Sequence, residues 1–255
     1  MKKLLVRLAD EVQKAVAGFK GSYGEKVSIG AYGSLTSAID KVAEKAVLDA
    51  IEEVDERLNI LSEEAGFIDR GGDLTLVLDP VDGTHNAERG LPIYSTSLAI
   101  GKKSMEDVSH ALVRDLVSGM TYYASKDDGA FLDDASIRVR NFDKKDALFT
   151  IYLSRNAHED AHHLAKKARR VRNLGAASLD MCLVATGAAD LYYMNSTAKQ
   201  AELRVVDVAA STLILREAGG EVIDLSRKRL DMPFDAKMRS NLIAYGDAKV
   251  LELVP

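Results

Sequence analysis

One stretch of the chain carries both a buried strand and a turn with two carboxylates: Leu76-Val77-Leu78-Asp79-Pro80-Val81-Asp82-Gly83-Thr84. The apolar run predicts a β-strand that ends at Asp79. Pro80 stiffens the turn that follows, because its ring fixes φ and removes a backbone donor. Asp82 comes shortly after Asp79, so both carboxylates and the Val81 carbonyl are expected to face one point beyond the strand.

The end of this stretch is suited to phosphate. Gly83 lets the backbone approach a ligand closely, and Thr84 is expected to open a short helix over residues 85–89. Backbone N–H groups at a helix N-terminus bind phosphate well. The turn therefore offers hard oxygen ligands beside an anion cradle, which is what a magnesium-assisted phosphate site needs. On spacing alone, the alternative is an Asp-rich turn in which Thr84 is only a helix cap.

Around this stretch, the N-terminal part of the chain shows helical patterns first and strand patterns afterwards. Apolar residues at helical spacing predict helices over residues 2–17 and 37–57. Five glycines between positions 18 and 33 predict a mobile loop, either a linker or a lid over a site. This order predicts an α+β half with a largely antiparallel sheet. The expected strands cover residues 58–61, 74–78, 94–100, 109–113, 120–124 and 130–132.

After about residue 145, strands and helices alternate, which indicates an α/β half. We therefore predict an α/β protein with two closely packed domains, residues 1–145 and 146–255. Helices are expected over residues 157–169, 178–186 and 206–217. Strands are expected over residues 148–153, 171–174, 191–193, 221–224 and 242–245.

Composition narrows the class of protein. The chain has 255 residues, 47% of them hydrophobic, and a formal net charge of −5. A mildly acidic chain is a poor candidate for nucleic-acid binding. With Cys182 as the single cysteine, neither an intramolecular disulfide nor a thiolate zinc cluster can form. No apolar run approaches the roughly 18 residues of a membrane helix, and Arg7 and Asp10 interrupt the N-terminal segment that starts like a signal peptide. We expect a cytoplasmic protein without nucleic-acid or membrane partners.

The run from Asp79 to Thr84 resembles the signature of the inositol monophosphatase family of magnesium-dependent, lithium-sensitive phosphatases. The stretch Leu203-Arg204-Val205-Val206-Asp207-Val208-Ala209-Ala210 resembles the second signature of that family, although Val206 and Ser211 replace the usual Trp and Gly. The resemblance implies the layered αβαβα sugar-phosphatase fold, with a metal cleft between the halves, and a homodimer.

The resemblance also groups acids that are distant in the sequence. By themselves, Glu63 and Glu64 end a solvated strand and Asp207 caps a helix. The family places Glu64 behind Glu63 in a metal site. The implied ligands of two Mg²⁺ ions are Glu63, Asp79, the Val81 carbonyl, Asp82 and Asp207.

Electrostatics supports this grouping. Two carboxylates about 4 Å apart repel by roughly 4 kcal/mol at an effective dielectric constant near 20. Four acids could not all stay ionised in one cleft unaided, and two divalent cations would balance them. Mn²⁺ is an expected substitute for Mg²⁺. A third metal is left open, because Tyr32 stands where relatives of the archaeal branch carry an acid.

The resemblance further implies the catalytic groups. Asp40 pairs with Thr84 to activate a water molecule, and the amides of Gly83 and Thr84 hold the phosphoryl oxygens. The alternative for Asp40 is a capping box at the start of its helix.

Substrate-side residues are less distinctive. The resemblance places Ala177 and Ser178 near the sugar or inositol ring, and Met194 replaces the glutamate with which animal inositol monophosphatases contact it. The archaeal branch of the family hydrolyses inositol phosphates and fructose 1,6-bisphosphate. We therefore expect a broad phosphatase for inositol 1-phosphate or fructose 1,6-bisphosphate, with adenosine 3′,5′-bisphosphate or NADP as alternatives. Three cations are either solvated surface groups or ligands of a second phosphate: Arg172, Lys199 and Arg204.

Two alternative functions, from other classes of protein, remain open. The run His158-Glu159-Asp160-Ala161-His162 matches the zinc metallopeptidase pattern, which needs both histidines on one helix face. Its flanking charges favour a surface helix instead. A non-catalytic protein that binds magnesium or a phosphate ligand is the other alternative, and it would need Thr84 and Asp40 to be disabled.

Overall fold

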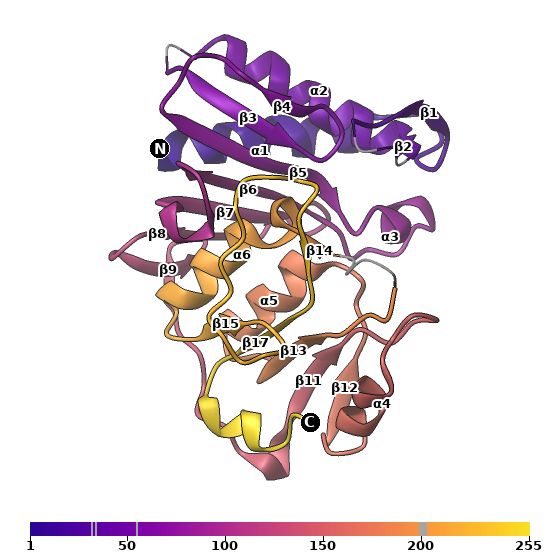
Figure 1. Cartoon of the computed structure of the whole chain (residues 1–255). Coiled ribbons are helices and arrows are strands. Elements are labelled where there is room, and N and C mark those ends of the chain that lie inside the picture. Colours follow the sequence, from indigo (N-terminus) through magenta and orange to yellow (C-terminus); the bar gives the residue numbers. More distant parts are fainter. Residues whose placement is uncertain (32, 34, 55, 199–202) are drawn as a thin grey trace.

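The computed structural model describes residues 1–31, 33, 35–54, 56–198 and 203–255. In this part of the chain, helices and sheets stack in alternating layers, and Figure 1 shows the stack from top to bottom. The predicted αβαβα arrangement is confirmed. The outer helices of the larger sheet are α1 (Lys2–Gly18) and α2 (Ala38–Glu52). The central helices are α5 (Ala177–Ala185) and α6 (Val205–Glu217), and α4 (Glu159–Ala165) covers the far face of the smaller sheet with the 3₁₀ turn Ala248–Glu252.

The larger sheet runs in the order β10-β9-β8-β7-β6-β5-β3-β4 among the described residues. Its pairs are antiparallel except for the parallel pair of β3 and β5, so the largely antiparallel sheet is confirmed. Its strands are β3 (Leu58–Ser62), β4 (Gly66–Ile68), β5 (Leu74–Asp82), β6 (Ser95–Gly101), β7 (His110–Asp115), β8 (Thr121–Ser125), β9 (Gly129–Leu132) and β10 (Ala135–Ile137). The connections include α3 (Thr84–Glu88) after β5 and the 3₁₀ turn Met105–Asp107 after β6.

The smaller sheet has the described order β12-β11-β13-β17-β15 and mixes parallel with antiparallel pairs. Its strands are β11 (Leu148–Ile151), β12 (Arg170–Arg172), β13 (Leu191–Met194), β15 (Glu221–Ile223) and β17 (Leu242–Tyr245). A short separate pair, β14 (Leu203–Arg204) with β16 (Arg239–Ser240), leads into α6.

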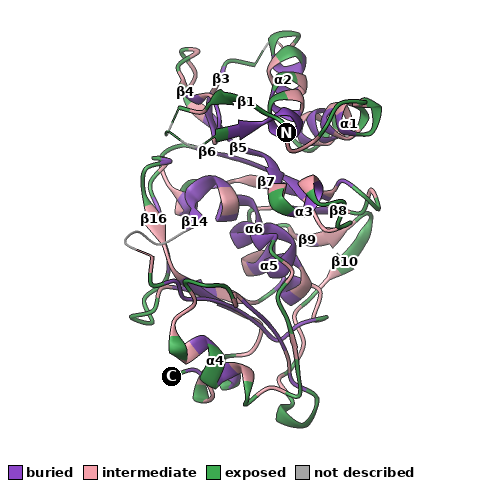
Figure 2. Cartoon of the chain, turned by 90° about the vertical axis from the view of Figure 1, so that its right-hand side faces the viewer, coloured by how far each residue is buried: buried purple, intermediate pink, exposed green. Residues whose placement is uncertain are grey.

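The core lies between the layers, because each sheet is covered on both faces. Leu5 of α1 belongs to one apolar cluster with Leu76 of the larger sheet. The helices α5 and α6 share a second cluster with both sheets, and Leu164 of α4 packs with Phe149 in a third. Figure 2 shows the central helices as buried, whereas β1 (Lys26–Ile29) and β10 are exposed.

Three expectations are corrected by the structure. Part of the segment 18–33 forms β1, which pairs antiparallel with β2 (Leu35–Ser37), because β-branched residues such as Val27 and Ile29 favour a strand. The helix expected to reach residue 57 ends at Glu52. The helix expected over 157–169 covers only Glu159–Ala165. Tyr32 lies outside the described residues. Among the described helices, none is long and apolar enough to span a membrane.

Candidate functional site

A bulge near the C-terminal end of β5 places both of its acids at that end of the strand. Asp79 pairs with Ser97 of β6 and Asp82 pairs with Ser95, so two residues of β5 oppose one of β6. The strand therefore continues to Asp82 instead of ending at Asp79, because a bulge tolerates the missing amide of Pro80. Asp79 and Asp82 both line one cavity of about 280 Å³.

Acids from three separate elements meet in this cavity. The parallel pairing of Ser62 with Leu78 places Glu63, at the end of β3, beside Asp79. Asp207 comes from the first turn of α6. Carboxylate oxygens of Glu63, Asp79 and Asp207 lie within 4.8 Å of one another. Over the described residues, no other group of three or more His, Cys, Asp or Glu side chains comes as close.

The local structure of Asp207 satisfies both interpretations of that residue. Its carboxylate accepts a hydrogen bond from the Arg204 amide at 2.7 Å, so it caps the helix. It also lines the cavity. The cap fixes the side chain at the helix start, where the macrodipole favours an acid.

The cluster holds more negative charge than its surroundings neutralise. Burial, and then the charge of Asp207, raise the pKa of Glu63 to about 8. Burial also raises the pKa of Asp207 to about 7, and burial together with Glu63 raises the pKa of Asp79 well above its usual range. Each ionised form is disfavoured by desolvation and by the neighbouring acids. The site is therefore suited to a ligand that carries positive charge.

Arg204 brings a positive charge into direct contact with this cluster. Its guanidinium donates to Oε1 of Glu63, and its side chain is only 8% exposed. The charge of Arg204 opposes the rise of the pKa of Glu63 without cancelling it. As a predicted substrate cation, Arg204 thus lies at the site but faces an acid.

Thr84 connects the acid cluster to Asp40. Its Oγ1 lies 2.8 Å from the Val81 carbonyl oxygen and 3.1 Å from Oδ1 of Asp40. The Ser37 hydroxyl donates to Oδ2 of Asp40 at 2.6 Å, and a capping box is formed. Burial raises the pKa of Asp40, and the hydrogen bonds from Ser37 and Thr84 oppose this rise. Asp40 therefore both caps α2 and faces Thr84.

The carboxylate of Asp82 is held from the substrate side of the cavity. It accepts hydrogen bonds from the amides of Ala177 at 3.1 Å and Ser178 at 2.8 Å, and from the Ser178 hydroxyl. Ser178 is fully buried, so it orients Asp82, whereas Ala177 lines the cavity. Burial raises the pKa of Asp82, and these hydrogen bonds counteract it.

Gly83 sits where no other residue fits. Its φ of +87° is left-handed, and an added Cβ would lie 2.9 Å from the Ile93 carbonyl oxygen and 3.1 Å from Cβ of Ala176. The backbone of the turn can therefore lie directly against the cavity. Gly83, Thr84 and His85 all line it at the start of α3, where the first amides have no intrahelical acceptor.

Two lining residues, Tyr152 and Tyr192, were not singled out from the sequence. They line the cavity together with Met194 and Leu203. Alternating strand residues point to one face of a sheet, and Tyr192 and Met194 are such a pair in β13. That alternation could have identified these two, but not Tyr152, which follows the end of β11.

Other predicted groups lie elsewhere. Arg172 is exposed at the end of β12 and does not line the cavity. Lys199 lies outside the described residues. Glu64 accepts from the Thr36 hydroxyl, and burial raises its pKa. Its carboxylate therefore lies against the β1–β2 hairpin, and its role behind a metal ligand stays a prediction.

The histidine pair does not form a metal site. His158 is the N-cap of α4, and its Nδ1 accepts from the Asp160 amide at 3.1 Å, so its ring faces its own helix. His162 lies inside the helix and is exposed. The zinc metallopeptidase alternative is wrong, because the cap prevents both histidines from presenting one helix face.

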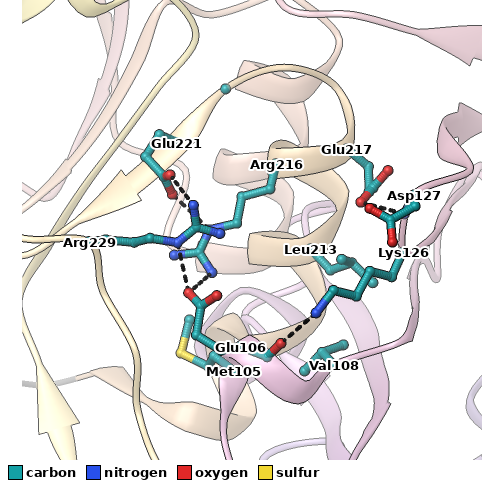
Figure 3. A pocket seen from close by; sticks show the side chains of 11 residues that line it. Met105, Glu106, Val108, Lys126, Asp127, Leu213, Arg216, Glu217, Glu221 and Arg229 are labelled. Carbon is teal, nitrogen blue, oxygen red and sulfur yellow. Dashed lines mark hydrogen bonds and ion pairs between the residues drawn. The ribbon is translucent and has the colours of Figure 1, made fainter.

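A second cavity, of about 260 Å³, contains two acids, Glu106 and Glu221, that are paired with arginines (Figure 3). Arg216 and Arg229 each form ion pairs with both Glu106 and Glu221, at 2.7–3.0 Å. Partial burial alone would raise the pKa of Glu106, but the hydrogen bonds and charges of Arg229 and Arg216 lower it. We regard this closed ring as a structural element.

Comparisons with known proteins agree with the geometry. The family model of the inositol monophosphatases matches residues 3–252. The chain is 33% identical to a fructose-1,6-bisphosphatase/inositol-1-monophosphatase from Methanothermobacter thermautotrophicus, over 99% of this chain and 94% of that protein. It is 32% identical to a bifunctional NADP phosphatase/NAD kinase from Methanococcus maripaludis, of which it covers 48%. A crystal structure of an inositol monophosphatase–fructose 1,6-bisphosphatase matches with a TM-score of 0.86 and 27% identity, over 99% of this chain and 97% of that one.

Proposed function

Because this chain belongs to the inositol monophosphatase family, we propose that it hydrolyses inositol and sugar phosphates with the help of Mg²⁺. The family is one of metal-dependent phosphatases, and the chain is a phosphoric monoester hydrolase that acts on small phosphate esters. The non-catalytic alternative is therefore wrong. The observation that carries the proposal is the meeting of Glu63, Asp79 and Asp207 within 4.8 Å beside the Gly83–Thr84 turn.

The donor set fits a hard divalent cation. Carboxylate and carbonyl oxygens are the ligands that Mg²⁺ prefers, and Mn²⁺ accepts the same set. We propose that Glu63, Asp79 and the Val81 carbonyl hold one ion, and that Asp79, Asp82 and Asp207 hold a second. The raised pKa values of the acids support this assignment, because a nearby cation would favour their ionised forms. Bound Mg²⁺ would supply the positive charge that activates water and stabilises the departing alkoxide.

Thr84 and Asp40 would orient the attacking water. A hydroxyl has one proton, and in the structure that proton has two acceptors, the Val81 carbonyl and Asp40. Once the carbonyl serves as a metal ligand, Asp40 is left as the acceptor. The lone pair of Thr84 Oγ1 can then accept a hydrogen bond from the attacking water; as the water gives this proton to Oγ1, the hydroxyl proton of Thr84 would pass to the buried carboxylate of Asp40.

The Gly83–Thr84 turn would hold the phosphoryl group. Gly83 and Thr84 line the cavity at the start of α3, and the left-handed Gly83 lets the backbone come close to a ligand, so the first amides of α3 would be available to a phosphoryl group. Amides that point at the phosphoryl oxygens stabilise the charge that shifts onto them during hydrolysis.

The apolar and aromatic lining residues favour a broad substrate range. Met194 carries no acid that would select an inositol ring, and Tyr152 offers an apolar surface to a sugar. Names of relatives support inositol 1-phosphate and fructose 1,6-bisphosphate. NADP is a second candidate, because a relative that matches the whole of this chain is named for NADP phosphatase activity. Binding of a second phosphate by Arg204 and Lys199 stays a prediction.

The test is a phosphate-release panel with Mg²⁺, comparing inositol 1-phosphate, fructose 1,6-bisphosphate, NADP and adenosine 3′,5′-bisphosphate. We expect the first two to be hydrolysed fastest and EDTA to abolish release. Fast release from NADP alone would move the assignment to the second candidate. Activity that survives EDTA and dialysis would contradict the metal site.

We also propose that the protein is a cytoplasmic homodimer and that each chain has two domains, divided at residues 145/146. Light scattering after size-exclusion chromatography checks the dimer.

A further inference from the structure

We propose that Glu44 is a positioning residue that holds the turn bearing Glu63, so that one helix, α2, aligns both sides of the site. The inference rests on the proposed function, because it takes Glu63 to be a metal ligand. Glu44 does not line the cavity and belongs to neither family signature, and no sequence pattern singled it out. It acts through the backbone that presents Glu63.

The carboxylate of Glu44 bonds to both ends of that turn. It is 1% exposed, and its Oε1 accepts hydrogen bonds from the Ser62 hydroxyl at 2.5 Å and from the Ala65 amide at 2.8 Å. Ser62 and Ala65 flank Glu63 and Glu64. A single buried oxygen therefore joins the two ends of the turn that carries both acids.

The rest of the turn is held by the strand that supplies Asp79. The Glu63 amide donates to the Leu78 carbonyl at 3.2 Å, and the Glu64 amide lies 3.4 Å from the Ser62 hydroxyl. The peptide of Glu63 is thus fixed on one side by β5 and on the other by Glu44. Moving Glu44 would move Glu63 relative to Asp79.

The burial of the Glu44 carboxylate is not explained by packing alone. Burying a carboxylate is costly unless it is paired and hydrogen-bonded, and the cationic partner of Glu44 is the half-exposed Lys41, 3.6 Å away. Hydrogen bonds to an ionised acceptor are shorter and stronger than those to a neutral one. The charge therefore gives the turn a stiffer attachment than an amide or hydroxyl would.

Helical spacing connects Glu44 to Asp40. Residues four apart lie on the same helix face, about 5–6 Å apart. Asp40 contacts Thr84, and Glu44 contacts the Glu63 turn one helical turn further along. The helix α2 therefore sets the position of the water-orienting pair relative to the metal ligand.

The experiment measures Mg²⁺ binding by isothermal titration calorimetry on the full chain, without substrate. We expect Glu44→Ala to weaken Mg²⁺ binding about 10-fold, the range found for groups that orient metal ligands. At saturating Mg²⁺, its kcat should return to within about 3-fold of wild type, because Asp40 and Thr84 are unchanged. Glu44→Gln keeps an acceptor oxygen but loses the charge, so its Mg²⁺ affinity should lie between those of Glu44→Ala and the wild type. Lys41→Ala is the matched control on the same helix and should bind Mg²⁺ like the wild type.

Ser62→Ala guards against a Glu44→Ala protein that does not fold. It removes one of the two hydrogen bonds and should weaken Mg²⁺ binding about 3-fold. Wild-type affinity in a folded Glu44→Ala protein, or in Ser62→Ala if the first does not fold, would overturn the inference. Glu63→Gln separates this failure from that of the proposed function: if Glu63→Gln binds Mg²⁺ normally, the metal site itself is wrongly assigned.

Discussion

The two charged cavities of this protein have similar volumes, about 280 Å³ and 260 Å³, yet they treat their acids in opposite ways. In the first, the pKa of Glu63 rises to about 8, because burial and Asp207 disfavour its ionised form. In the second, Glu106 meets two guanidinium groups, and its pKa falls despite partial burial. The difference is charge balance. In the second cavity, arginines of the chain pair with the acids, which therefore stabilise the fold. In the first cavity, the acids lack enough cationic partners in the chain and are available to bind a cation from solution.

The largest effect is expected from removing one acid of the first cavity. Asp79→Asn keeps the side-chain shape and removes a charge that the proposal shares between two metal ions. We expect kcat/KM for phosphate release to fall about 10³-fold or more. The melting temperature of the metal-free protein should not fall, because repulsion within the cluster decreases.

Glu106→Gln is the counterpart of this variant in the second cavity. It should leave kcat/KM unchanged and lower the melting temperature. An Asp79→Asn protein with nearly normal kcat/KM would contradict the assignment of the first cavity.

The next effect concerns the hydroxyl beside the acids. Thr84→Val preserves the shape of the side chain and removes the group that orients water, so we expect kcat to fall about 10²-fold. Mg²⁺ affinity measured by calorimetry should stay the same. Thr84→Ser retains the hydroxyl and should keep most of the activity; a Val variant as active as the Ser variant would remove Thr84 from the proposed mechanism.

The two cavities should also respond differently to pH. Glu63 and Asp207 have folded-state pKa values of about 8 and 7, above their usual values, so the folded protein binds protons more tightly than the unfolded chain. Their stabilising effect is complete below about pH 4 and is lost as the pH rises through 7 to 8. In EDTA, the melting temperature should fall by more than about 5 °C between pH 5 and pH 8.

Added Mg²⁺ should cancel that fall, because the ionised acids then have a partner. The lowered pKa of Glu106 acts in the other direction, since its contribution is lost only in acid. Differential scanning fluorimetry across this pH range measures the melting temperature with EDTA and with Mg²⁺. A metal-free melting temperature that stays constant or rises with pH would contradict the prediction.

The smallest effect on activity is expected from variants in the closed ring of ion pairs in the second cavity. Arg216 is 11% exposed and Arg229 is 55% exposed, although both contact Glu106 and Glu221. Arg216→Ala should cost about 2 kcal/mol and lower the melting temperature by about 4 °C. Arg229→Ala should cost less than about 0.5 kcal/mol, because solvent screens its charge. Neither should change kcat; a loss of activity in either variant would mean that the second cavity is not purely structural.

The acids of the site were predictable because two local patterns carry them. The run from Asp79 to Thr84 places a strand, a turn and a helix start in one short segment, and the pattern around Asp207 marks the start of a helix. Resemblance to the family then joined them with Glu63, which by itself looks like an ordinary strand end. The change of pattern near residue 145 predicted an α+β half followed by an α/β half, and the resemblance to the family implied the layered fold, although the division into two domains stays a prediction.

What could not be predicted depends on side-chain direction and on contacts between distant segments. Arg204 was expected either at the solvated surface or against a second phosphate, but its guanidinium contacts Glu63, far away in the sequence. Pro80 was expected to end a strand, whereas the bulge lets β5 continue. Glu44 is invisible as a motif, because its partners Ser62 and Ala65 come near only when β3 packs beside α2.

The burial of α6 bears on how the proposed metal ions would leave the site. Ten of its residues are buried, between Val205 and Leu215, and it packs against both sheets. Segments of this kind open last in hydrogen–deuterium exchange, with free energies close to that of global unfolding. Because this helix carries Asp207, we expect that local fraying would not release this proposed ligand. Ion exchange at the site should therefore proceed through solvent access to the cavity, at rates independent of backbone opening.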